Sequence, residues 1–272
     1  ENNNRQNGII FRISENLSIY NKDTKPEIKD HVQQIKKLWK SIEIGDKRAG
    51  SFFNLNLMAK NYAISDLLNG GHDAHLSNIR FYFNPNNKLV EPISREWDPN
   101  TYSYSYLQKN KQLTWERDHI KNNIVCNILY SDTLFQTLYI NELYKISNSM
   151  FLDSFFIKIE DSLNGMTKKV YRDNPFYKYP KEFLYNNQKF IKAKLFSNKG
   201  IAAYIDTVTD KSIIFKVRLI ESLAVKILNL SFDEKKLKNN QENIILASKQ
   251  NKNQIKTFEY FLPKGVRAKN VK

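Results

Sequence analysis

The spacing of the apolar residues changes at about Gly200, and this change divides the chain into two kinds of structure. Before it, apolar residues recur every three or four positions in several segments, which is the period of an amphipathic helix. After it, short β-branched and aromatic runs alternate with polar turns, which is typical of strands. The sequence therefore predicts an α+β protein, with a mainly helical unit over residues 1–198 and a small antiparallel β domain over residues 199–272.

Two helices in the first part have clear boundary signals. The first is expected to carry Pro26 in its first turn, with Thr24 as its N-cap, and to stop at Gly45-Asp46. The second is predicted from about residue 50 to residue 68, and Asn69-Gly70-Gly71 supplies the left-handed conformation that ends helices. Further helices are predicted at residues 114–123, 132–147, 151–163 and 182–196, with a linker at residues 173–181.

A β-hairpin is the clearest local prediction. Its strands are expected at residues 79–83 and 88–93, around an Asn84-Pro85-Asn86-Asn87 turn. The run GIIFRI predicts a further strand at residues 8–13. Beyond Gly200, strands are predicted at residues 213–219, 223–230, 243–247 and 255–262.

The formal net charge of +15 comes from 43 Lys and Arg against 28 Asp and Glu. A charge of this size can indicate a nucleic-acid or anionic-membrane partner. The basic residues are nevertheless scattered, apart from Lys235-Lys236-Leu237-Lys238, and abundant Lys, Asn, Ile, Tyr and Phe are typical of AT-rich codons. We therefore do not expect a nucleic-acid partner. No apolar run reaches the roughly 20 residues that cross a bilayer, so no membrane span is expected in this chain.

Cys126 is the single cysteine. It excludes a disulfide framework and a cysteine-based zinc site within this chain. Because it lies in an apolar stretch, a buried thiol without a chemical role is expected.

A polar loop, HDAHLSN, lies between the second helix and the hairpin. His72 and His75 flank Asp73, which could hint at a metal site, but no third His is nearby and a plain polar loop explains the two histidines better. Asp73 and Asn78 have the spacing of the catalytic loop in kinase-like folds, where the Asp acts on the hydroxyl nucleophile and the Asn binds a metal. A second metal-binding acid should then follow the hairpin, where the sequence has Glu96-Trp97-Asp98. Alternatively, Asp73 caps a turn and Asn78 bonds to backbone.

The segment GGHDAHLSNIRFYFNPNNKLVEPI resembles the catalytic segment of the CotH family, the spore-coat-type atypical protein kinases of bacteria. GIIFRISENL is similar to a segment upstream of that loop, and EFLYNNQKFIKAKLFSNKGIAAYI to one downstream. LAVKILNLSFDEKKL and FEYFLPKG resemble the β-rich tail of the same proteins. The resemblance is colinear and covers most of the chain.

The resemblance implies a kinase-like helical C-lobe with an embedded hairpin, which transfers the γ-phosphoryl group of ATP to a protein hydroxyl with Mg²⁺ or Mn²⁺. Asp73 takes the position of the catalytic base, and Asn78 that of the ligand to the nucleotide-bound metal. The second metal acid is either Asp98, which keeps the family's W-D context, or Glu96, which keeps its distance from E-P-I. We favour Asp98.

The family's ATP-clamping lysine and its nucleotide-covering strands lie upstream of the segment that GIIFRISENL resembles. The resemblance therefore implies that this chain is a C-terminal portion without the N-lobe. Many relatives carry a membrane anchor further upstream, so the compartment within a bacterium stays open.

A rival interpretation is a catalytically inactive relative, a structural or interaction module of an envelope or coat assembly. The E-W-D departure from the family pattern favours this rival, whereas the intact D-x4-N pattern favours the enzyme. Exposed edge strands of the β domain would then supply the surface for a protein partner.

Overall fold

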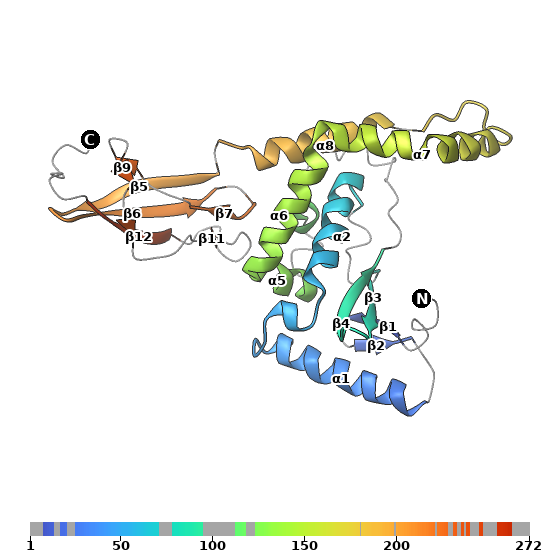
Figure 1. The fold of residues 1–272 in the computed structure, drawn as a ribbon, viewed down its shortest axis with the longest axis horizontal. Helices are drawn as coiled ribbons and strands as arrows, with labels where there is room; N and C mark the ends of the chain where they lie inside the picture. The colour runs from blue at the N-terminus through green and yellow to red at the C-terminus, as the bar shows by residue number, and fades with distance from the viewer. Residues whose placement is uncertain are drawn as a thin grey trace. The chain divides into compact units, whose positions relative to one another are not determined.

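The computed structural model describes residues 8–13, 17–20, 25–70, 78–94, 112–117, 123–179, 181–198, 200–220, 222–227, 231–232, 235–236, 238–239, 245–246 and 255–262 (Figure 1). Its contacts divide the chain into two compact units, Glu1–Leu195 and Phe196–Lys272, where the sequence predicted a boundary at residues 198/199. Helices and antiparallel sheets occur together, which confirms the predicted α+β class. No helix among the described residues is long and apolar enough to cross a membrane.

A four-stranded antiparallel sheet with the order β2-β1-β3-β4 lies in the first unit (Figure 1). The predicted hairpin forms β3 and β4, and the GIIFRI run forms β1. Alternate side chains of β1, namely Ile9, Phe11 and Ile13, are buried, as expected of a strand with one covered face. The short β2 was not predicted. The strands are β1 (Ile9–Ile13), β2 (Leu17–Ile19), β3 (Arg80–Asn84) and β4 (Leu89–Ile93).

Helix α1 (Pro26–Glu43) contacts β1, and its buried stripe includes Ile35, Trp39 and Ile42. Its N-cap is Lys25, so the prediction of Thr24 was wrong by one residue. Pro26 occupies the first helical position, where its missing N–H needs no capping partner.

Helix α2 (Leu55–Leu68) begins five residues later than predicted, after a 3-10 turn, η1 (Ala49–Ser51). Phe52 and Phe53 leave the helical path and join the margin of the sheet. The Val90 N–H donates to the Phe52 carbonyl (2.7 Å), and the Asn54 N–H donates to the Val90 carbonyl (2.8 Å). The Asn54 side chain then caps α2. Tertiary pairing with β4 therefore decides where this helix starts.

Helix α2 packs against α6 (Thr133–Ser147) and α8 (Lys181–Leu195) of the same unit. The predicted helix at residues 114–123 was wrong, because the chain forms the 3-10 turn η3 (Thr114–Glu116), and a separate helix begins after the Asn123 cap. Cys126 is buried, as predicted. The described helices that follow α2 are α5 (Ile124–Ser131), α6 (Thr133–Ser147), α7 (Ser149–Val170) and α8 (Lys181–Leu195).

The second unit is built on an antiparallel sheet with the order β10-β12-β6-β5. Its core consists of Val217, Leu219, Phe258 and Tyr260. Strand β5 was not predicted. The sheet strands are β5 (Ile201–Val208), β6 (Ser212–Leu219), β10 (Lys238–Asn239) and β12 (Ile255–Phe261), and two small ribbons pair β7 (Val225–Lys226) with β11 (Ile245–Leu246) and β8 (Ser231–Phe232) with β9 (Lys235–Lys236).

Candidate functional site

The predicted site residues fall mostly in two segments next to described structure. Asn78 is half-buried and lies just before β3. Asp73, Glu96 and Asp98 lie outside the described residues, as do His72 and His75. The structure therefore describes the residues on either side of these two segments, which are residues 71–77 and 95–111.

The first segment leaves the C-terminal end of α2. Asn69 adopts a left-handed conformation (φ 52°) and ends the helix, as the sequence predicted. The Gly70 N–H donates to the Ser65 carbonyl (2.8 Å), and the Ser65 hydroxyl donates to the Gly70 carbonyl (3.0 Å). These two hydrogen bonds fix the chain at the point where it enters residues 71–77.

The second segment leaves the hairpin after β4 and is held by the same helix. The Ser94 hydroxyl donates to Oδ1 of Asn61 (2.7 Å). Asn61 is a buried polar residue of α2, so this bond also satisfies an amide oxygen that would otherwise lack water.

The far end of the second segment returns to α2 at Asp66. The Thr114 N–H donates to Asp66 Oδ1 (2.5 Å), and the Tyr139 hydroxyl donates to Asp66 Oδ2 (2.5 Å). The Arg117 guanidinium donates to both the side-chain oxygen and the carbonyl of Asn69. Residues 112–117 are thus tied to the last turn of α2.

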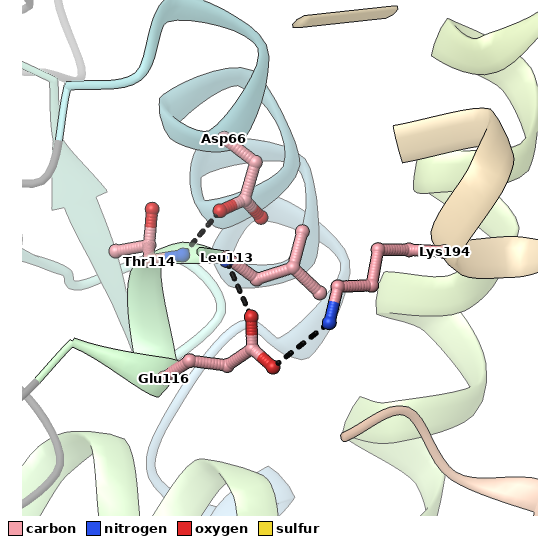
Figure 2. A network of polar contacts seen from close by, with 5 residues as sticks. All are labelled: Asp66, Leu113, Thr114, Glu116 and Lys194. Carbon is pink, nitrogen blue, oxygen red and sulfur yellow. Dashed lines mark hydrogen bonds and ion pairs between the residues drawn. The ribbon is translucent and has the colours of Figure 1, made fainter. Parts of the chain in front are cut away.

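Figure 2 shows a second link that holds these residues in place. Glu116 Oε2 accepts from the Leu113 N–H (2.7 Å), and Glu116 Oε1 forms an ion pair with Lys194 Nζ of α8 (3.4 Å). Both side chains of the ion pair are largely covered, at 24% exposed for Lys194 and 12% for Glu116. The 3-10 turn is therefore clamped between α2 and α8.

The electrostatics of this region are dominated by the burial of Asp66. Burial raises the pKa of Asp66 from 3.8 to about 6, and hydrogen bonds from Tyr139 and Thr114 oppose part of that rise. Burial also raises the pKa of Tyr130 and of Tyr139 well above the ordinary value. The ring centroids of Tyr130 and Tyr139 lie 5.3 Å apart, and Asp66 is itself only 6% exposed. Asp66 therefore binds protein groups in a dry environment and is not placed to hold a solvated ion.

The sequence reasoning did not identify Asp66, Asn61 or Arg117. The sequence did contain a signal for Asp66, because Ser65-Asp66 interrupts the otherwise apolar run AISDLL. A carboxylate buried in such a run requires polar partners. Among the residues that the structure describes, no three His, Cys, Asp or Glu side chains form a cluster that could hold a metal ion.

Comparison with known proteins adds no assignment: no family model matches the chain, and neither curated proteins nor solved structures show a significant match. The functional interpretation therefore depends on the motif and on the contacts described above.

Proposed function

We propose that the first unit is the C-lobe of a CotH-like, ATP-dependent phosphotransferase that acts on a protein hydroxyl. In this proposal, Asp73 accepts the proton of the attacking hydroxyl. Asn78 and one of Asp98 or Glu96 hold Mg²⁺ or Mn²⁺ against the nucleotide phosphates. The bound metal would neutralise the negative charge that develops on the phosphates during phosphoryl transfer.

The observation that carries the proposal is the attachment of both candidate segments to one half of α2. The anchors on this helix extend from Asn61 to Asn69, which is about 12 Å along the helix axis. Asp73 lies three residues beyond Gly70, and an extended chain of that length reaches about 11 Å. Asp98 lies four residues beyond Ser94, which gives a reach of about 14 Å. These lengths let the two acids meet beside the end of α2.

The chemistry of the donor set supports a hard cation. The amide of Asn78 and the carboxylate of Asp98 or Glu96 supply oxygen ligands, which Mg²⁺ and Mn²⁺ prefer. Carboxylates brought together without a cation would repel each other, so the same arrangement would be unfavourable in a purely structural loop.

The experiment is calorimetric titration of Mn²⁺–ATP into the protein expressed from its complete gene, comparing wild type with Asp73→Ala, Asn78→Ala, Asp98→Ala and Glu96→Ala. Loss of either metal ligand is expected to weaken binding at least about tenfold, because each removes a charged or polar contact worth more than about 1.4 kcal/mol. Asp73→Ala is expected to bind the nucleotide and to lose phosphoryl transfer.

Two matched control variants remove an amide and a carboxylate elsewhere in the first unit. Asn86→Ala changes an exposed amide in the turn of the same hairpin, and Asp46→Ala an exposed carboxylate after α1. Both should bind as wild type does. If Asp98→Ala and Glu96→Ala both bind metal–ATP like wild type, the kinase proposal fails. An inactive module of an envelope or coat assembly, with a protein partner, then takes its place.

A further inference from the structure

Strand β5 is an edge strand of the sheet in the second unit, and no described strand pairs with its outer side. It is eight residues long and mostly exposed, with Tyr204 at 47% and Ile205 at 40%. Proteins usually protect an edge of this length with proline, lysine or other charges. β5 contains no proline or lysine, and its single charged residue is Asp206.

The register of β5 on β6 shows which backbone groups face outward. The Ile220 N–H donates to the Gly200 carbonyl (3.0 Å), so these two residues form a hydrogen-bonded pair. Hydrogen-bonded and non-hydrogen-bonded pairs alternate along an antiparallel ladder. Ile201, Ala203 and Ile205 therefore belong to non-hydrogen-bonded pairs with β6. Their N–H and C=O groups point away from β6.

The side chains of these three residues share the apolar face of the sheet. Directly opposite them on β6 are Leu219, Val217 and Phe215, which belong to the core or pack against it. Residues directly opposite each other in a ladder lie on the same face. A strand added to β5 through these three residues would therefore extend the apolar face and cover part of Ile205.

The charge on β5 does not oppose pairing with an identical strand. Asp206 already forms an ion pair with Lys216 (2.7 Å). The register shifts between Ile205 and Thr207, which marks a β-bulge at Asp206. This bulge limits regular pairing to residues 201–205, a stretch that carries no charge.

We propose that β5 pairs with β5 of a second copy of this chain, antiparallel, with the two-fold axis at Ala203. This register is self-complementary: Ile201 lies opposite the partner's Ile205, and Ala203 opposite the partner's Ala203. On the other face, Tyr204 lies across from the partner's Ala202. The three outward-facing residues of each strand provide about six backbone hydrogen bonds. The proposal is independent of whether the first unit binds a nucleotide.

The first experiment is a disulfide cross-linking test on the full chain. In the proposed register the two Ala203 Cα atoms are about 5.5 Å apart, within the range that a disulfide spans. Mild oxidation of Ala203→Cys is therefore expected to give a covalent dimer. Ala202→Cys is the matched control, because its side chain is on the other face and its copies are diagonal neighbours, roughly 7–8 Å apart. Cys126 does not compete, since it is buried in the first unit.

The expected result is at least about tenfold more cross-linked dimer for Ala203→Cys than for Ala202→Cys at equal concentration. Equal cross-linking of the two variants would overturn the proposal.

Sedimentation of the unmodified chain is the second measurement. Its mass should rise from 32.1 kDa toward twice that value over the micromolar range. Ala203→Lys should stay at 32.1 kDa, because it sets two like charges directly opposite each other. Added salt should favour the dimer, since it screens the repulsion between two chains of charge +15. A wild-type chain that stays monomeric throughout, or an association that salt weakens, would refute self-pairing and leave an acidic partner strand as the occupant.

Discussion

The substitution Asp66→Asn should remove a defined pH dependence from the stability of the first unit. Asp66 is 6% exposed and accepts hydrogen bonds from Thr114 and Tyr139. Burial raises its pKa from 3.8 in the unfolded chain to about 6 in the folded one. The Asn side chain has the same shape, can still accept the Thr114 N–H, and does not ionise at any pH in this range.

The sign follows from the direction of the shift. Between pH 3.8 and about 6 the folded state binds more protons at Asp66 than the unfolded state does. Its contribution to stability is therefore fully present below pH 3.8 and is lost as the pH rises through about 6. A shift of this size corresponds to about 3 kcal/mol, at 1.36 kcal/mol per pKa unit.

The assay is urea unfolding at a series of pH values from about 4 to 7.5, followed by tryptophan fluorescence. All three Trp residues of the chain lie in residues 1–195, so the signal reports on the first unit alone. Subtracting the variant's free energy of unfolding from that of wild type cancels every other titrating group. The difference should fall by about 2.4 kcal/mol across this range, because the first part of the change, about 0.5 kcal/mol, lies below pH 4.

Asp153→Asn is the matched control. Asp153 also accepts a tyrosine hydroxyl, from Tyr185 (2.7 Å), but this pair is exposed at the surface. Its difference curve should change far less, because water solvates the ionised carboxylate. A wild-type minus Asp66→Asn difference that is flat to within about 0.5 kcal/mol would refute the argument from burial.

Three further substitutions test contacts of the first unit by the same unfolding assay. Lys194→Gln should lower the free energy of unfolding by about 1–3 kcal/mol, because it leaves the largely covered Glu116 carboxylate without its ion pair. The control, Lys40→Gln on the exposed surface of α1, should lower it by less than about 0.5 kcal/mol. Asn123→Ala should cost about 1 kcal/mol, because the Asn123 side chain accepts the N–H groups of Val125 and Cys126 at the start of α5; a loss below about 0.3 kcal/mol would contradict the capping role. Phe81→Ala should lower the free energy of unfolding by about 3–5 kcal/mol, because the Phe81 ring packs against Phe11 and Phe53. A loss as small as that of Lys40→Gln would contradict the burial of Phe81 in the core.

The local elements of this protein could be predicted from the sequence where nearby residues determine the conformation. Pro26 favours a helix start, Asn69 accepts the left-handed conformation that ends a helix, and the Asn-Pro-Asn-Asn turn brings two strands together. The α+β class followed from the same signals, because the period of the apolar residues differs between helices and strands. The D-x4-N pattern likewise defines Asp73 and Asn78 as candidates without any structure.

Contacts between distant segments were decided by the tertiary structure. Phe52 and Phe53 lie within a run that is compatible with helix, yet they pair with β4, because the sheet offers them hydrogen bonds and a buried surface. Residues 114–123 have a helical pattern, but only a 3-10 turn forms at its start. Arg117 is extended (φ −69°, ψ 139°), and its guanidinium donates to Asn69, 48 positions earlier.

The edge strand illustrates the same division. Residues 201–208 (IAAYIDTV) contain five β-branched or aromatic residues, but two adjacent Ala and Asp206 interrupt them, and no strand was predicted there. They become a strand because β6 supplies a partner for their backbone groups. The sequence determines what each segment can form with its neighbours along the chain. The tertiary structure selects among those possibilities, because a buried polar or backbone group must find its partner wherever the fold places one.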